Sequence, residues 1–202
     1  MSALTTCYLK YPLVVAPAYK RMAEAASQAP GGEIFALYGF KLKTLGDWEV
    51  ELNPKGSRAK GDAVFHTPKG NKVYVSWGPL QEVTKRFKSI EEHRDWGMKA
   101  LKKSRDVQSV AATEEEEAIV CGHRALITRV TVSVVSGFMI RKQADRSISS
   151  VYLYCPDRSK YFIIYTLLDF PDEYGGFQTT FDSTVRSFTC HGTSGCPAVA
   201  TE

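Results

Sequence analysis

The sequence has no long hydrophobic run. In its 202 residues one of the most apolar regions, Val130–Gly137, is interrupted by Thr131, Ser133 and Ser136, whereas a membrane-spanning helix needs about 20 consecutive apolar residues. Near the N-terminus Lys10 precedes a short apolar run that is broken by prolines, which is a poor match to a secretory signal peptide. We therefore expect a cytoplasmic protein with no membrane partner.

Side-chain amides are also scarce. Asparagine occurs only at Asn53 and Asn71, and glutamine occurs at five positions. Because amides are thermolabile, their depletion is one mark of proteins from hot environments. Charged residues make up 24% of the chain, which is an ordinary fraction. The composition therefore favours a thermophilic source through its amides alone.

The signature motifs of the common enzyme classes are missing. The sequence has no phosphate-binding loop of the form Gly-x-x-x-x-Gly-Lys-Ser/Thr, no Gly-x-Gly-x-x-Gly after a strand, no His-Glu-x-x-His and no Gly-x-Ser-x-Gly. The nearest approach to a nucleophile with its base is Cys121-Gly122-His123, where the glycine more commonly marks a bulge or a turn. We therefore expect no catalytic residues and no cofactor.

The five cysteines are too scattered for a disulfide-rich secreted domain of this size. Cys121 and Cys155 lie in strand-like runs, which favours buried free thiols. Cys190-His191 followed by Cys196 could bind zinc or close a short disulfide, but a structural zinc site needs four ligands and usually contains a Cys-x-x-Cys pair. We predict no metal and a Cys190 disulfide. Cys155 is the preferred partner, because a bridge from the sheet to a helix end would anchor the tail, and Cys196 is the alternative.

Two helices are indicated by their apolar spacing and their ends. Near residues 173–188, five bulky apolar side chains recur three or four positions apart, on one stripe of a helix: Tyr174, Phe177, Phe181, Val185 and Phe188. An earlier helix is predicted to begin at the capping box Ser89-Ile90-Glu91-Glu92 and to end near Ser104. His93 interrupts the apolar arc of this earlier helix, and we expect it to be a hydrogen-bonded histidine at the border of the core.

Strand-like runs fill much of the remaining chain. They cover residues 35–45, 48–52, 63–66, 73–77, 107–112, 118–121, 123–136, 151–155 and 161–168, with an acidic run at 114–117 and a charged connector at 141–146. Turn-forming residues between neighbouring runs favour antiparallel hairpins. The sequence therefore predicts a single α+β domain over residues 33–190, an antiparallel β-sheet flanked by helices. Residues 1–32 are predicted to be an N-terminal arm or peripheral helix, and residues 191–202 a flexible tail.

Positive charge is concentrated in the first half of the chain. Residues 1–105 contain 18 lysines and arginines against 10 acidic residues, whereas residues 106–202 contain 8 against 12. Six of the basic residues lie on predicted hairpin loops or beside the first helix: Lys55, Arg58, Lys60, Lys85, Arg86 and Lys88. A surface built from them would attract phosphate backbones or an acidic protein surface. The alternative is an ordinary solvated face.

The order of these motifs resembles the PsbP-like superfamily. The likeness covers about residues 40–190 and follows the segments Asp47-Trp48-Glu49-Val50, Val73–Trp77, Ser89-Ile90-Glu91-Glu92, Gly122-His123-Arg124-Ala125, Tyr152–Cys155, Tyr161–Thr166 and Phe181-Asp182-Ser183-Thr184-Val185-Arg186-Ser187-Phe188. The resemblance implies a PsbP-like α/β/α sandwich, with helices on both sides of an antiparallel sheet, and a non-enzymatic role in binding or assembly. Residues 1–32 have no counterpart in this family, and no functional residue can be transferred by motif.

Three functions are compatible with these observations. The first is a non-catalytic binding or assembly factor that engages a larger protein or a ribonucleoprotein through the basic residues named above. The second is a nucleic-acid-binding protein that uses the same residues, and the third is an enzyme whose site carries no recognised motif. Binding to nucleic acid should weaken steeply with salt, because each phosphate contact releases counterions, whereas a protein interface with an apolar centre should weaken less. The sequence does not indicate an oligomeric state.

Overall fold

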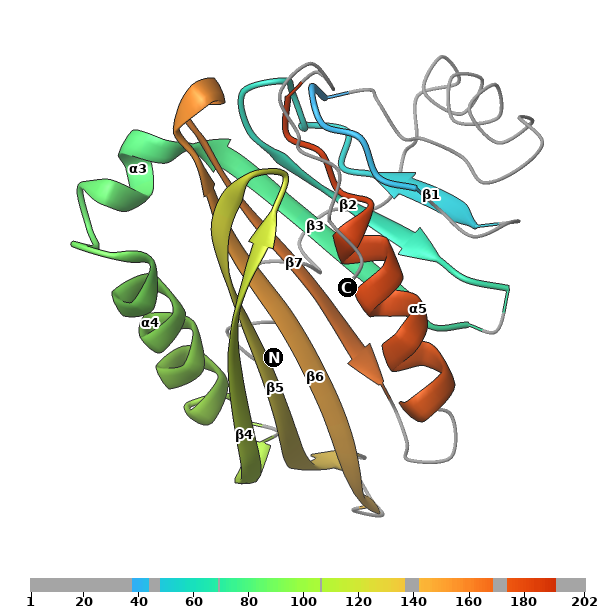
Figure 1. Ribbon diagram of the computed structural model, residues 1–202. Helices are drawn as coiled ribbons and strands as arrows, with labels where there is room; N and C mark the ends of the chain where they lie inside the picture. The colour runs from blue at the N-terminus through green and yellow to red at the C-terminus, as the bar shows by residue number, and fades with distance from the viewer. Residues whose placement is uncertain are drawn as a thin grey trace, which may run out of the picture.

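Seven strands form one antiparallel sheet in the order β1-β2-β3-β7-β6-β5-β4 (Figure 1). The computed structural model describes residues 38–43, 48–68, 70–105, 107–136, 142–168 and 174–191. The strands are β1 (Glu49–Leu52), β2 (Gly61–His66), β3 (Lys72–Pro79), β4 (Val107–Val120), β5 (His123–Ser136), β6 (Lys142–Cys155) and β7 (Lys160–Leu168). The helices of these residues are α3 (Leu80–Thr84), α4 (Ile90–Lys102) and α5 (Tyr174–Arg186), with a 3₁₀ turn η1 at Pro156–Arg158.

The architecture confirms an α+β chain dominated by an antiparallel sheet. Strands β1 to β3 form one meander and β4 to β7 another, and the pairing of β3 with β7 joins them. Helices α3 and α4 connect the two meanders along the chain. The predicted arm at 1–32 and residues 192–202 lie outside the described residues. Among the described residues, no helix is both long enough and apolar enough to cross a membrane.

Tight turns set the register of the long hairpins. Cys121 and Gly122 form the two-residue turn between β4 and β5, and their φ angles are +51° and +77°. Positive φ at both central residues defines a type I′ turn, whose twist matches that of the strands. Gly122 therefore marks a turn, as its sequence context suggested. The turn between β6 and β7 ends at Ser159, which also has a positive φ of +51°.

Two charged segments outside the predicted strands lie in strands. The acidic run Glu114–Glu117, for which no structure was predicted, lies inside β4, where it pairs with residues 126–129 of β5. The predicted connector at 141–146 is wrong, because β6 begins at Lys142 and pairs with β5 from the first residue onward. Charged residues have low strand propensity by themselves, but cross-strand pairing with a strongly β-forming neighbour decides the outcome.

The larger part of the core lies between α5 and one face of the sheet. Phe177, Phe181, Val185 and Phe188 are buried as predicted, and they pack with strand residues that include Phe65, Val75, Phe162 and Ile164. The Phe188 ring lies edge-on to Phe162, with centroids 5.0 Å apart. The apolar stripe of α5 therefore packs on every second residue of the strands, as expected for an amphipathic helix against one face of a sheet.

Helix α4 packs against the other face of the sheet, on the strand positions of β5 and β6 that alternate with those facing α5. Ile90 is buried with Leu126 and Tyr152, while Leu101 is half-buried beside Val130. The helix starts with the predicted capping arrangement, because the Glu92 backbone N–H donates to Ser89 Oγ at 3.3 Å. The Glu92 carboxylate accepts from the backbone N–H of Lys88 at 2.6 Å, one residue before the cap. Both contacts satisfy amides that the helix itself cannot pair.

Gly97 of α4 lies against Tyr152 of β6. A Cβ at this position would overlap the hydroxyl of Tyr152, whose ring is buried against His93. We expect Gly97→Ala to lower the free energy of unfolding by about 1–2 kcal/mol, because the overlap outweighs the gain of about 1 kcal/mol from higher helix propensity. Urea unfolding measures the difference.

A double-mutant cycle identifies the cause of this effect. In a Tyr152→Phe background the overlapping hydroxyl is gone, so Gly97→Ala should become neutral or stabilising by up to about 1 kcal/mol. An equal loss of stability in both backgrounds would show that the close contact with Tyr152 is not responsible.

Candidate functional site

The first group of basic residues lies on the loop between β1 and β2. Asn53 organises the start of this loop, since its side-chain oxygen accepts from the backbone N–H of Lys55 at 2.9 Å and its amide donates to Asp62 at 3.0 Å. The Trp77 indole N–H donates to the carbonyl of Ser57 at 2.9 Å, which fixes the middle of the loop to a buried side chain of β3. These contacts fix the loop that carries Arg58, and the Arg58 side chain is exposed.

An ion pair joins this loop to α3. Lys60 Nζ lies 2.6 Å from Glu82 Oε2, and this hydrogen bond raises the pKa of Lys60. The backbone N–H of Leu80, at the start of α3, donates to the carbonyl of Ser159 at 2.8 Å. Three segments that are distant in sequence, the β1–β2 loop, α3 and the β6–β7 turn, therefore meet at one end of the sheet.

Arg86 lies beside Trp96, the only large apolar side chain of α4 that is strongly exposed. Its guanidinium carbon is 5.3 Å from the centroid of the Phe87 ring and 5.2 Å from that of Trp96. Trp96 is 49% exposed. Stacking on two rings limits the conformations of the arginine without removing its charge. Lys85 and Lys88, on either side in sequence, are exposed.

Two further cations lie at this end of the sheet. No sequence pattern marks Arg158 and Lys160, because only the turn between β6 and β7 places them here. Lys160 Nζ donates to the carbonyl of Arg58, and also to that of Tyr38 at 3.1 Å. Partial burial lowers the pKa of Lys160, and the nearby charges of Arg158 and Arg58 lower it further. Positive charges therefore crowd this region closely enough to affect one another.

The contacts described above link two of the six predicted basic residues, Arg58 and Lys60, to other segments at this end of the sheet. Lys60 touches α3, and Arg58 and Lys160 are joined by a hydrogen bond. That all six predicted residues, Lys55, Arg58, Lys60, Lys85, Arg86 and Lys88, act as one partner-binding surface stays a prediction.

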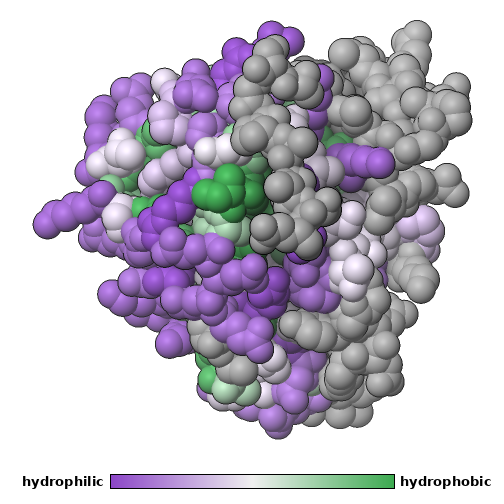
Figure 2. Space-filling view, in the orientation of Figure 1, coloured by the Kyte–Doolittle hydropathy of each residue, from purple (hydrophilic) through white to green (hydrophobic). Residues whose placement is uncertain are grey.

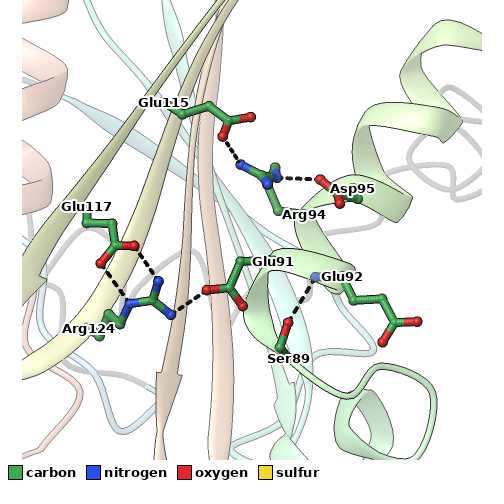
Figure 3. Close-up of polar contacts among 8 residues, drawn as sticks. All are labelled: Ser89, Glu91, Glu92, Arg94, Asp95, Glu115, Glu117 and Arg124. Atoms are coloured by element: carbon green, nitrogen blue, oxygen red, sulfur yellow. Dashed lines mark hydrogen bonds and ion pairs between the residues drawn. The ribbon is translucent and has the colours of Figure 1, made fainter.

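The acidic run on β4 belongs to a network of ion pairs with α4 and β5 (Figure 3). Arg94 lies 2.6 Å from Glu115, and Arg124 pairs with Glu117 and Glu91. Arg129, farther along β5, pairs with Glu116. A shallow pocket of about 260 Å³ lies among these residues, between α4 and the β4–β5 hairpin. Because its carboxylates face arginines, the pocket offers little net charge to a ligand.

His93 is a buried member of an aromatic cluster and not an exposed base. It is 4% exposed, its Nδ1 lies 3.2 Å from the hydroxyl of Tyr154, and its ring stacks on Phe87 with centroids 4.7 Å apart. Burial lowers the pKa of His93 to about 4, and the charge of Arg86 contributes. The expectation of a hydrogen-bonded histidine at the sheet–helix border is confirmed.

A second cluster brings together thiols and imidazoles from three parts of the chain. Cys121 lies in the turn between β4 and β5, Cys155 ends β6, and Cys190 follows α5. His123 begins β5, and His191 follows Cys190. Cys121, Cys155 and Cys190 form no disulfide with one another, and Cys155 and Cys190 are fully buried. No spacing within the sequence predicts this meeting, which depends on the sheet order and on the path after α5.

Cys121, His191 and Asp157 form a chain of polar contacts. Cys121 Sγ lies 3.1 Å from His191 Nδ1, and His191 Nε2 lies 3.1 Å from Asp157 Oδ2. The backbone N–H of Cys190 also points to Cys121 Sγ, with the nitrogen 3.4 Å away. A thiol, an imidazole and a carboxylate in this order can either activate a nucleophile or hold a metal ion.

Cys155 and Cys190 are in hydrogen-bond contact. The Cys190 thiol donates to Cys155, which lowers the pKa of Cys155 to about 6, and the backbone N–H of Arg158 adds to this effect. The same contact raises the pKa of Cys190, because its proton is held in the bond. These are the two thiols of the predicted disulfide, so the structure brings the pair together with both free. The bridge itself stays a prediction.

No protein-family model matches this sequence, and no curated protein matches it. Among solved structures, the chain is similar to cyanobacterial PsbP (CyanoP) from Synechocystis sp. PCC 6803, solved in solution, with 16% sequence identity and a TM-score of 0.41. The match covers 74% of this chain and 85% of that chain. This is a loose PsbP-like resemblance in fold.

Proposed function

We propose that this protein is a non-catalytic binding or assembly factor that engages an acidic surface of a larger protein. The supporting observation is the placement of Arg86, held over the exposed Trp96 ring at 5.2 Å and flanked in sequence by the exposed Lys85 and Lys88. Tryptophan and arginine are enriched among the residues that dominate protein interfaces, because they combine a large apolar area with a polar or charged group.

Acidic residues within the region favour a protein partner over nucleic acid. Glu82 pairs with Lys60, Glu92 lies at the start of α4 beside Lys88, and Asp157 precedes Arg158. These carboxylates would repel a continuous phosphate backbone, whereas a protein surface can place its charges between them. Figure 2 shows mostly hydrophilic side chains on the face in view, with a small hydrophobic area near its centre.

The proposal includes three features suggested by the sequence. They are a PsbP-like α/β/α sandwich as the scaffold, a cytoplasmic location and a thermophilic source. The scaffold matters for function because rigid elements hold binding loops more accurately than free segments do.

Reversing the charges of Lys85, Arg86 and Lys88 to glutamate should abolish partner binding and leave the fold intact. These side chains are exposed, and exposed charges contribute little to stability. The tagged protein would be used to capture the partner from a nuclease-treated lysate of its source, and the partner would be identified by mass spectrometry. Binding of the purified partner to wild type and variant would then be measured by calorimetry.

A matched variant separates this surface from positive charge in general. Lys99, Lys102 and Lys103 lie on or beside the last turn of α4, and their reversal to glutamate makes the same change in net charge. This control should retain most of the affinity. Equal binding by both triple variants and by wild type would place the interface elsewhere. Binding that survives only without nuclease and falls steeply with salt would identify a nucleic-acid partner instead.

A further inference from the structure

We propose that the cysteine–histidine cluster is a binding site for Zn²⁺, with Cys121, Cys155, Cys190 and His191 as its four ligands. Three thiolates and one imidazole make a closed tetrahedral set, which is the composition of structural zinc sites. The site would be structural and not catalytic, because no ligand position is left for water or substrate.

The positions of three ligand atoms support this assignment directly. The atoms of Cys121, Cys190 and His191 lie within 4.8 Å of one another, as do those of His123, Cys155 and Cys190. Both groups share Cys190, but among the described residues no such group joins Cys155 to Cys121 or His191, so the Cys155 side chain must turn toward them to complete the set. Zinc–ligand bonds of about 2.0–2.3 Å place neighbouring ligand atoms roughly 3.5 Å apart. The Cys121–His191 and Cys190–His191 separations of 3.1 and 3.9 Å lie on either side of that value.

His191 is the imidazole best oriented for zinc. Its Nδ1 faces two sulfurs, and its Nε2 faces the carboxylate of Asp157 at 3.1 Å. A zinc-bound histidine almost always donates its other N–H to a carboxylate, a carbonyl or water, which fixes the ring. His123 is placed differently, since its buried Nε2 has no hydrogen-bond partner among the described residues and lies 3.7 Å from Asp157. Its ring packs against that of His191, with centroids 5.0 Å apart.

The surroundings suit the charge of the bound ion. Zn²⁺ with three thiolates carries one net negative charge, and thiols lose their protons when they bind it. The Cys190 N–H that points to Cys121 and the Arg158 N–H that points to Cys155 would stabilise the sulfur charges. Lys160 lies close enough to Cys155 to interact with its charge. Two backbone N–H groups and a nearby cation would therefore offset the negative charge of the sulfurs.

A zinc site accounts for more of the cluster than a cysteine nucleophile does. The order Cys121, His191, Asp157 would suit a nucleophile, its base and an orienting carboxylate, but it assigns no role to Cys155 and Cys190. Both of these thiols are fully buried. The positive φ of Cys121 is no sign of a strained nucleophile either, because the type I′ turn between β4 and β5 requires it.

Metal content and cobalt spectroscopy test the proposal on the full-length protein. The protein would be purified in reducing buffer without chelator, and zinc would be measured by mass spectrometry of the elements. We expect one zinc per chain. After removal of zinc, titration with Co²⁺ should produce the visible bands of a tetrahedral ion and the sulfur-to-metal bands of thiolate ligands, both saturating at one equivalent.

Variants identify the ligands. Cys190→Ser and His191→Ala should lose the stoichiometric ion, whereas Cys7→Ser and His66→Ala serve as controls and should keep it. Because Cys190 is fully buried and its variant could fail to fold, Asp157→Asn provides a milder test on an exposed residue. Loss of the carboxylate that orients His191 should weaken zinc binding by about 10- to 100-fold, measured by competition with a chromophoric chelator.

Four results would count against the proposal. The first is the absence of zinc together with a Co²⁺ spectrum lacking thiolate bands. The second is a Cys155–Cys190 disulfide in protein isolated under alkylation without reductant, since it removes two ligands. The third is selective alkylation of Cys121 in protein that contains no metal, which would indicate a reactive nucleophile. The fourth is loss of zinc in His123→Ala but not in His191→Ala, which would overturn the ligand set. None of these results depends on the partner proposed above.

Discussion

Replacing Phe181 with alanine should lower the free energy of unfolding by about 3–5 kcal/mol, the range measured when a buried phenylalanine is truncated in a core that cannot collapse. Phe181 is fully buried at the centre of α5 and belongs to the cluster that joins this helix to the sheet. The cavity would lie between Phe177, Val185 and the strands, which are held by pairing on both sides. Urea unfolding, followed by circular dichroism, measures the loss.

Ser183→Ala on the same helix is the matched control. Ser183 is exposed, so its truncation removes no core contact and should change stability by less than about 0.5 kcal/mol. A loss below about 1 kcal/mol for Phe181→Ala would mean that α5 does not contribute to the core. The packing of α5 against the strands would then be wrong, even if the sheet were correct.

The second large effect should appear in acid. His93 is buried and its pKa is about 4 in the folded protein, whereas the pKa of a histidine in the unfolded chain is about 6.5. Between these two pH values the unfolded chain binds more protons than the folded one, so stability falls as pH falls. The contribution is fully present above about pH 6.5, and about 3 kcal/mol is lost by pH 4.

A neutral replacement isolates this effect. In His93→Gln the side chain cannot titrate, so the fall in stability assigned to His93 between pH 6.5 and pH 4 should disappear. His66→Gln on β2 is the control and should leave the fall in place. Chemical denaturation at several pH values gives the slopes, and the ring resonances of His93 in NMR give its pKa directly. A His93 pKa close to 6.5 in the folded protein would contradict the prediction.

The sequence by itself determined the helices, because their signals are local. The capping box at Ser89 and the apolar stripe from Phe177 to Phe188 lie within one turn or one face, so no distant residue is needed to interpret them. The structure places α4 at Ile90–Lys102 and α5 at Tyr174–Arg186, close to the predicted limits. The alternation of apolar and polar residues in β5 is also a local signal, and the bounds of this strand agree with the predicted range of 123–136.

Only the tertiary structure decided the charged strands. Lys142–Arg146 and Glu114–Glu117 lack the composition of strands, and they become strands because β5 lies between them and pairs with both. The arginines of β5 and α4 then face the glutamates of β4. A partner strand supplies both the hydrogen bonds and the opposite charge, and neither is visible in the segment alone.

The same limit applies to both candidate sites. The basic residues were visible in the sequence as a charge imbalance, but Trp96 joined them only through its contact with Arg86. Arg158 and Lys160 joined them only because the β6–β7 turn meets α3 and the β1–β2 loop. Cys121, Cys155 and Cys190 are separated by more than thirty positions each, and a local motif such as Cys-x-x-Cys is absent. Their approach follows from strand order, because β4–β5 and β6–β7 turn at the same end of the sheet and the chain returns there after α5.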